Sequence, residues 1–157
     1  MNNYSVCFPD GWRVYQDKTL DRVSGCNRKN GNCTGNGGGF PYPGVVFIFV
    51  LPAKSVPNHP PYRDVTDIVS SVPHAGAPPP PITEVSLSGP LSGTAKCLLA
   101  RMLMFDEVWN DVYGLDIDKT LFRAWAQYNN ELPKVEHYRS TIVQILSSIS
   151  LRKPRDR

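Results

Sequence analysis

Long hydrophobic runs are missing from this sequence of 157 residues. The longest, VVFIFVL at 45–51, is much shorter than the roughly 20 apolar residues that a membrane-spanning helix needs. The opening MNNYSV has neither a charged segment nor an apolar one, so it does not resemble a signal peptide. Two explanations stay open. Either the protein is cytosolic, or Met1 stands where a leader, with or without a lipid anchor, has been removed.

The sequence also has little excess charge. Seventeen Lys and Arg residues against 14 Asp and Glu residues leave a net charge of +3, which does not by itself predict a nucleic-acid partner. With 41% hydrophobic and 20% charged residues, the composition is typical of a globular protein, and the length suits one core. We therefore expect one domain over 1–151, followed by a basic solvated tail at 152–157.

Motifs for catalysis and metal binding are absent. The sequence has no G-x-S-x-G, no H-E-x-x-H and no C-x-x-C, and its three histidines have no ligand-spaced partner. His59 and His74 fall in proline-rich segments, and His137 falls on the polar side of a predicted helix, so we expect all three at the surface. The sequence therefore predicts no catalytic residue, no metal site and no cofactor.

Acidic residues do gather between 106 and 118, in FDEVWNDVYGLDIDK. They lack the D-x-D-x-D-G spacing and the closing glutamate of a calcium-binding EF-hand. Because Trp109 and Tyr113 alternate with these acids, we expect an acidic loop that its aromatic side chains hold against the core.

Cysteines are few, and two of the four lie in the glycine- and asparagine-rich segment GCNRKNGNCTGNGGG at 25–39. The spacing of Cys26 and Cys33 suits neither a zinc site nor a redox motif, and no Lys-Ser/Thr follows to make a phosphate-binding loop. Ordering so many glycines costs backbone entropy, and a disulfide closing this ring offsets about 2–3 kcal/mol in the chain-entropy model. We therefore predict a Cys26–Cys33 disulfide, and with it an oxidising compartment: the periplasm, the cell surface or the exterior.

Hydrophobic periodicity predicts strands and two helices. The segment 45–51 is apolar on both faces, which indicates a central strand covered on both sides. Alternation predicts a strand at 83–87 and an opening strand from Tyr4 to Phe8, after which Trp12 and Val14 re-enter the core. By composition 96–105 and 121–127 suit strands or helices, and we predict strands because turn signals bound each segment at strand length. Apolar residues at helical spacing predict helices between Tyr62 and Val72 and from Pro133 to Lys153, the second with this stripe: Val135, Tyr138, Ile142, Ile145, Leu146 and Ile149.

A helix with one apolar side must bury it, and here the available partner is a sheet. We therefore expect the α+β class: an antiparallel β-sheet with helices packed on both faces, an α/β/α sandwich with a long glycine-rich loop closed by a disulfide.

The order of the predicted elements resembles that of a known family. An extended opening into FPDGW, a middle helix, further strands, an aromatic-rich strand and a helix ending in ILSSISL resemble the PsbP-like and Mog-type α/β/α sandwich domains. The resemblance implies an antiparallel sheet between helices, no known catalytic set and a role in binding partners. Members include extrinsic photosystem subunits, a Ran-binding nuclear-import factor and bacterial exported or lipoprotein-anchored proteins. The cysteine loop and the segment HAGAPPPP at 74–81 depart from this pattern, so it assigns no partner.

A candidate binding surface follows from alternation within two predicted strands. Arg101 lies on the more polar side of 96–105, and Arg123 and Trp125 lie on the more polar side of 121–127. We expect these sides to form one sheet surface that binds a partner, because Arg and Trp are enriched at binding hot spots. The alternative is that a helix covers this surface and the arginine stems lie along it.

Cys7 is expected on the same side of the sheet as Cys97. A Cys7–Cys97 disulfide can form if their strands are neighbours within disulfide range.

Two classes of function remain. The first is a non-catalytic extracytoplasmic domain that binds a protein or envelope partner. The second is a small hydrolase-type enzyme whose residues meet only in the fold, for example His74 with the acids of 106–118. A deep cavity that holds a histidine within hydrogen-bond reach of a carboxylate would favour the enzyme.

Overall fold

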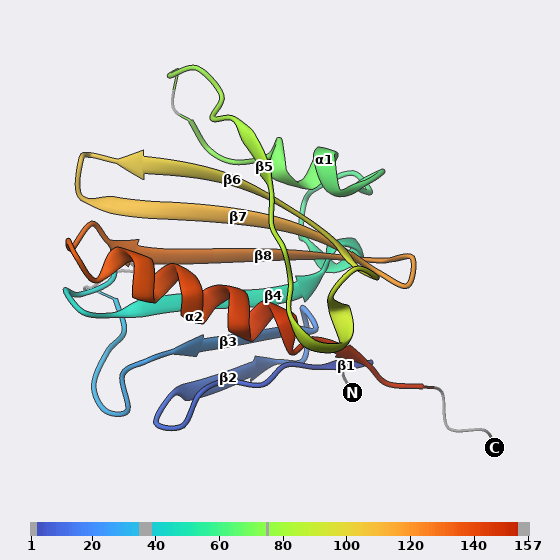
Figure 1. Ribbon diagram of the computed structural model, residues 1–157, viewed down its shortest axis with the longest axis horizontal. Helices are drawn as coiled ribbons and strands as arrows, with labels where there is room; N and C mark the ends of the chain where they lie inside the picture. The colour runs from blue at the N-terminus through green and yellow to red at the C-terminus, as the bar shows by residue number, and fades with distance from the viewer. Residues whose placement is uncertain (1–2, 35–38, 75, 154–157) are drawn as a thin grey trace.

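The structure, a computed structural model, describes residues 3–34, 39–74 and 76–153 (Figure 1). Within these residues, seven strands form one antiparallel sheet in the order β2-β3-β4-β8-β7-β6-β5, and β1 pairs separately with β9. The strands are β1 (Tyr4–Ser5), β2 (Arg13–Asp17), β3 (Arg22–Cys26), β4 (Val46–Pro52), β5 (Ile82–Glu84), β6 (Lys96–Met104), β7 (Val108–Ile117), β8 (Thr120–Asn129) and β9 (Ser150–Leu151). The helices are α1 (Val65–Val69) and α2 (Val135–Ser147), with short 3-10 turns η1 (Ala53–Ser55) and η2 (Gly89–Leu91).

Strands β6, β7 and β8 form the centre of the sheet as a continuous meander. The β6–β7 turn contains Phe105 and Asp106, and the β7–β8 turn contains Asp118 and Lys119, all with positive φ. Two consecutive residues of positive φ match the twist of antiparallel strands, so each turn is a tight hairpin connection. The strands predicted at 96–105 and 121–127 are confirmed as β6 and β8.

The segment 106–118 was predicted to be an acidic loop, and this prediction is wrong. It forms the hairpin turn and then β7, a ten-residue strand buried along most of its length. The strand β7 was not predicted because its apolar residues alternate with Asn, Asp and Gly, which are depleted in ordinary strands.

Helix α2 covers one face of the sheet, as the apolar stripe predicted (Figure 1). Tyr138, Ile142 and Leu146 are buried against side chains of the central strands. The helix is shorter than predicted, since it ends at Ser147 and the following residues turn to form β9. The face under α2 holds the larger core, built from these strand residues: Val23, Val46, Ile48, Val50, Cys97, Leu99, Tyr113, Leu115, Ile117, Phe122, Ala124, Ala126 and Tyr128.

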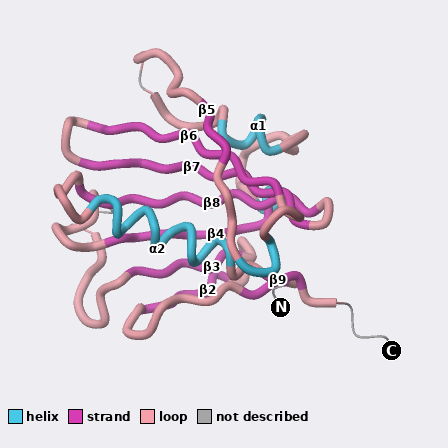
Figure 2. The backbone as a smooth tube through the Cα atoms, in the orientation of Figure 1, coloured by secondary structure: helices cyan, strands magenta, loops and turns pink. Residues whose placement is uncertain are grey.

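The opposite face has no second helical layer in the described part of the chain, so the predicted α/β/α sandwich is wrong. Figure 2 shows strands and loops around one long helix. The helix expected between Tyr62 and Val72 is reduced to the single turn α1, which packs over β6 and β7. Its apolar residues are buried, but Ser70 and Ser71 bond back to carbonyls of the turn, and such bonds compete with continuation of a helix.

Gly114 of β7 permits the close contact with α1. A Cβ at this position would lie 2.7 Å from the carbonyl oxygen of Val65. Only glycine allows the helix backbone to approach the sheet so closely.

Two expectations, one for the opening segment and one for the segment 45–51, are also wrong. The opening strand is limited to β1, and Val14 lies on the edge strand β2 with 45% of its surface exposed instead of entering the core. The segment 45–51 is not covered on both sides either: Val46, Ile48 and Val50 are buried under α2, whereas Phe47 and Phe49 on the other face are only half-buried. That second face is the candidate site.

Candidate functional site

The sheet face opposite α2 carries aromatic and arginine side chains in rows that cross strands β2, β3, β4 and β8. In the middle row, Tyr15 pairs with Ser24, then Phe49, then Trp125. On the same side, Asp17 of β2 pairs with Arg22 of β3, and Leu51 of β4 pairs with Arg123 of β8. Another row runs from Arg13 through Cys26, Phe47 and Gln127 to Asn110. We call this surface the arginine–aromatic face and define it by Arg13, Tyr15, Arg22, Phe47, Phe49, Asn110, Arg123, Trp125 and Gln127.

Each of three aromatic rings on this face has a guanidinium group above it. The guanidinium carbon lies 5.4 Å from the ring centre of Tyr15 for Arg13, 5.4 Å from that of Phe49 for Arg22, and 5.9 Å from that of Trp125 for Arg123. These distances are within the range of cation–π attraction. The Phe49 and Trp125 rings meet edge to face at 5.4 Å, so the aromatic row is one packed cluster.

Unpaired hydrogen-bond donors concentrate on the arginine–aromatic face. Among the described residues, four buried side-chain nitrogens have no partner, and all four lie here: Nε of Arg13, Arg22 and Arg123, and Nδ2 of Asn110. Buried donors are normally bonded, because an unsatisfied one costs about 1–3 kcal/mol. The face therefore holds four donors that lack acceptors and are shielded from solvent by their neighbours.

The three arginines differ in what compensates their charge. Arg22 pairs with Asp17 at 3.6 Å, and Arg13 donates to the carbonyl of Gly31. Arg123 forms no ion pair with a carboxylate among the described residues, its Nε has no hydrogen-bond partner, and Tyr62 is close enough to affect its charge. Desolvation by burial lowers the pKa of Arg123, and the electrostatic effect of Tyr62 opposes this shift.

Asn110 is 1% exposed, and its orientation is determined by two neighbours. Its Oδ1 accepts hydrogen bonds from Trp125 Nε1 at 3.1 Å and from Gln127 Nε2 at 2.6 Å. The amide oxygen must face these two donors, so the unpaired Nδ2 is directed elsewhere.

Arg101 does not lie on this face, so the predicted surface of Arg101, Arg123 and Trp125 is wrong in one member. Arg101 pairs across the strands with Asp111, which pairs with Ala126 under α2, whereas Trp125 pairs with Val112 on the other side. Alternation within a strand identifies which residues share a side. It does not show which sides of two strands coincide, because that depends on the register of their pairing.

Arg101 belongs to a buried polar network under α2. Its Nε and Nη2 donate to the two carboxylate oxygens of Asp111 at 2.8 and 2.9 Å, and the hydroxyls of Tyr113 and Tyr128 donate to the same carboxylate at 2.9 Å each. Burial, followed by the charge of Asp111, raises the pKa of both tyrosines, so they stay protonated donors at neutral pH. With four donors on it and no exposed surface, Asp111 is a structural anion and not a general base.

The predicted Cys26–Cys33 disulfide is confirmed, with the two Cα atoms 6.3 Å apart. Cys26 lies on the arginine–aromatic side of β3, so the disulfide holds the loop over the end of that face. Cys7 and Cys97 are free, and the alternative pairing of these two is not formed. Cys97 is buried in the core under α2, where burial raises the pKa of its thiol to about 12, while Cys7 is exposed.

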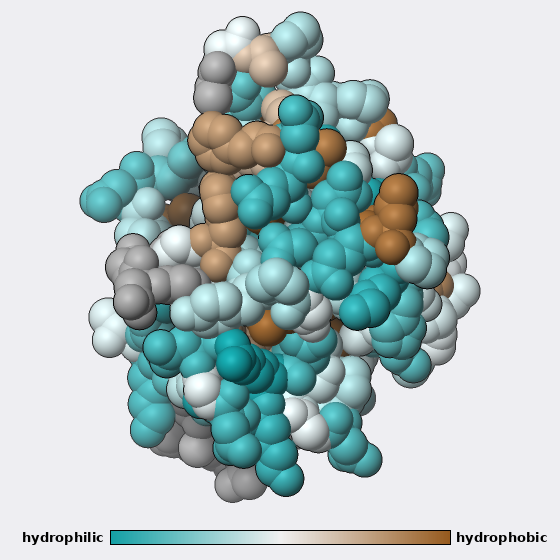
Figure 3. All heavy atoms as spheres, turned by 90° about the vertical axis from the view of Figure 1, so that its left-hand side faces the viewer, coloured by the Kyte–Doolittle hydropathy of each residue, from teal (hydrophilic) through white to brown (hydrophobic). Residues whose placement is uncertain are grey.

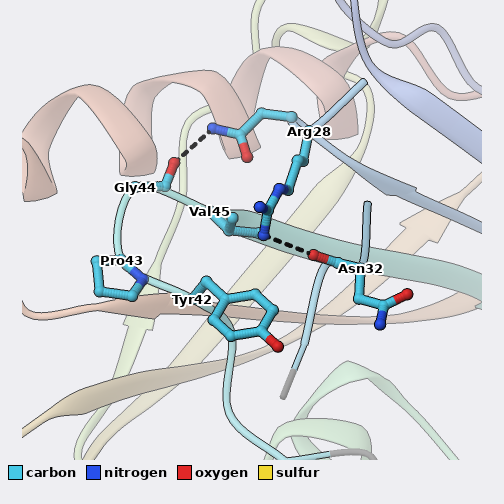
Figure 4. Close-up of a pocket in the computed structure, with 7 residues that line it drawn as sticks. Arg28, Asn32, Tyr42, Pro43, Gly44 and Val45 are labelled. Atoms are coloured by element: carbon cyan, nitrogen blue, oxygen red, sulfur yellow. Dashed lines mark hydrogen bonds between the residues drawn. The ribbon is translucent and has the colours of Figure 1, made fainter. Parts of the chain in front are cut away.

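A cavity of about 500 Å³ lies beside the disulfide loop (Figure 4). Arg28 lines it, stacked 5.1 Å from the ring centre of Tyr42 and donating to the carbonyl of Asn32 at 2.9 Å. The side chain of Asn27 donates to Gly44 and so binds the loop to the start of β4. These groups bond to one another, and the lining contains no acid or base suited to proton transfer at neutral pH.

His59 and His74 lie in loops and His137 lies exposed on α2, as the sequence predicted. His59 stacks on Tyr62 with ring centres 4.1 Å apart, and the Nδ1 of His74 lies 2.8 Å from the carbonyl of Ala77. No hydrogen bond among the described residues joins His74 to the acids of 106–118, so the pairing considered for a hydrolase is not formed. The described residues contain no cluster of ligands for a metal ion, and no helix among them has the length and apolar character needed to cross a membrane.

The end of the molecule formed by the β6–β7 hairpin exposes two apolar side chains. Phe105 at the hairpin tip is 77% exposed, and Leu132 before α2 is 83% exposed. Figure 3 faces this end and shows hydrophobic areas set among hydrophilic residues. Asp106 and Glu107 follow Phe105 at the tip, so this exposed surface is acidic as well as apolar.

Comparison with known proteins adds no family. No protein-family model matches the chain, and no curated protein sequence matches it. Among solved structures, a crystal structure from Bacteroides thetaiotaomicron VPI-5482 is similar, with 10% sequence identity and a TM-score of 0.49. The match covers 98% of this chain and 47% of the other, so this chain spans about half the length of that structure. A likeness at this level carries no argument about function.

Proposed function

We propose that this protein is a non-catalytic, extracytoplasmic domain that binds a protein partner through the arginine–aromatic face. The observation that carries the proposal is the uncovered half of the sheet. Over β2, β3 and β4, no helix of the described residues packs on the side of Phe49, whereas Trp125 of β8 borders the cluster that Ile68 and Val69 of α1 help to form. Exposed aromatic clusters with a polar border are typical of interaction sites.

The residue types support a protein partner. Tyr15 is 50% exposed, and Phe47, Phe49 and Trp125 are half-buried, so the face combines apolar area with guanidinium groups. Tyr, Trp and Arg are the residues most enriched at the energetic centres of protein–protein interfaces. Because these side chains extend from paired strands, the surface is rigid before a partner arrives, which lowers the entropy cost of binding.

The disulfide supports the compartment. A Cys26–Cys33 bond closes a loop that contains few apolar side chains, and such bonds persist in the periplasm, at the cell surface and in secreted proteins. The proposal is therefore periplasmic, cell-surface or secreted localisation.

The proposal is tested by capture from the envelope and secreted fractions of the native source, using the full chain as bait. Trp125→Ala and Arg123→Ala are expected to reduce recovery of the bound protein at least tenfold, because each removes a central side chain of the face. Arg63→Ala is the matched control, since the Arg63 side chain is 85% exposed and lies outside the face. Thermal unfolding of each variant checks that it is folded. Equal recovery by all three variants would contradict the proposal.

A further inference from the structure

We infer that the partner segment bound by the arginine–aromatic face is acidic, and that one of its carboxylates pairs with Arg123. This inference rests on the proposed function, since it names the chemistry of the partner at the same face.

The charge balance of the face requires an anion. Over strands β2, β3, β4 and β8, this side of the sheet carries Arg13, Arg22 and Arg123 against a single carboxylate, Asp17. Asp17 is already engaged by Arg22, which leaves Arg123 as a half-buried cation without a counter-ion among the described residues. A carboxylate accepts two parallel N–H bonds from a guanidinium, the pairing that compensates such a charge best.

Asn110 gives a second and independent indication. Its side chain is almost fully buried, and its Oδ1 is occupied by Trp125 and Gln127, yet Nδ2 has no acceptor. All four unpaired groups of the face, including this one, are donors, so the missing complement consists of acceptors. Carboxylate and peptide carbonyl oxygens of a protein segment supply acceptors and no competing donor.

The placement of the arginines argues against other acidic ligands. Sugars and nucleic-acid bases bind aromatic residues by stacking on free ring faces. Here the rings of Tyr15, Phe49 and Trp125 each have a guanidinium above one face, and the Phe49 and Trp125 rings also pack edge to face against each other. The Nε atoms of the three arginines are buried, so the terminal N–H groups of Arg123 remain for a ligand. They lie beside apolar ring edges, a surface that suits an acidic side chain next to an apolar one.

The experiment compares two synthetic peptides of equal length, acetyl-GEFEFG-amide and acetyl-GQFQFG-amide, by NMR titration of the full chain. The glutamate peptide is expected to bind at least tenfold more tightly, with shifts at the Trp125 indole, and to weaken as salt is added. Arg123→Gln should abolish the difference between the peptides. Arg63→Gln, the exposed control, should preserve it.

Several results would overturn the inference. These are equal affinity for the two peptides, a preference that survives Arg123→Gln in a folded variant, or tighter binding of trigalacturonate, an acidic sugar. Self-association that Arg123→Gln abolishes would also overturn it, since the occupant would then be a second copy. If Trp125→Ala still loses the captured protein while the peptides bind equally, the proposed function stands and only the acidic partner is wrong.

Discussion

At the scale of single residues, the polar groups of this protein divide between two opposite faces of one sheet. Asp111 under α2 accepts four hydrogen bonds and is fully satisfied, whereas the Nε of Arg123 on the other face has no hydrogen-bond partner that the structure describes. The first arrangement stabilises the fold, and the second is suited to binding. Burial alone does not separate these roles, because both groups are removed from water. The difference lies in whether their hydrogen bonds are made within the chain.

Asp111→Asn tests the structural role. An amide keeps the shape but removes the charge that Arg101 faces and turns an NH2 group toward donors, so we expect a loss of about 3–5 kcal/mol in the free energy of unfolding. Urea unfolding measures this. Glu107→Gln, an exposed acid at the neighbouring hairpin, should change the stability by less than about 0.5 kcal/mol. A similarly small effect for Asp111→Asn would mean that the network does not stabilise the fold.

At the scale of elements, the disulfide loop replaces packing with a covalent constraint. The loop between β3 and β4 is attached at Cys26–Cys33, through Asn27 to Gly44 and Val46, and by a bridge between Thr34 and Pro41. The backbone therefore has defined contacts although few apolar side chains are available. This explains how the described residues 27–34 of the loop can border the arginine–aromatic face.

Replacing both Cys26 and Cys33 by serine is expected to lower the free energy of unfolding by about 2–3 kcal/mol, the chain-entropy value for so short a ring. Thermal unfolding with and without a reductant measures the effect: reductant should lower the Tm of the original protein and leave that of the double variant unchanged. Cys7→Ser is the control and should remain sensitive to reductant, since Cys7 is free. A Tm of the original protein that reductant does not change would contradict the prediction.

At the scale of the whole molecule, the two ends of the described chain are joined at one place. Strand β1 pairs with β9, and the backbone N–H of Arg152 donates to the carbonyl of Asn3 at 2.8 Å. Tyr4 anchors this pair to the main sheet, because its ring packs against Phe122 and its hydroxyl lies 3.0 Å from the carbonyl of Val50. The small two-stranded sheet therefore closes the end of the core under α2.

Tyr4→Ala should therefore destabilise the whole domain by about 3–5 kcal/mol, as for other large buried aromatic residues. Tyr15→Ala is the matched control. Half of Tyr15 is exposed on the edge strand, and we expect a change within about 1 kcal/mol. The measurement is urea unfolding followed by tryptophan fluorescence. Equal effects of the two substitutions would show that the ends of the chain do not contribute to the common core.

Local chemistry was enough to predict several elements. The stripe from Val135 to Ile149 predicted α2, turn signals at strand-length spacing predicted β6 and β8, and the composition around Cys26 and Cys33 predicted their disulfide. These signals depend on neighbours within a few residues, which the sequence displays directly. The resemblance to PsbP-like and Mog-type domains remains a prediction.

Only the tertiary structure decided which side of each strand faces α2. Arg101 and Arg123 occupy similar positions in their own strands, yet the pairing through β7 places them on opposite faces. Likewise, the apolar residues around Ile68 indicated a helical layer. In the structure they form the single turn α1, and Tyr62 and Val72 in the loops before and after it join the same cluster over β6 and β7. Register and coverage are set by contacts between residues distant in the sequence, and a shift of one residue exchanges the two faces of a strand. The sequence therefore determined α2, β6, β8 and the disulfide, while long-range pairing determined the arginine–aromatic face.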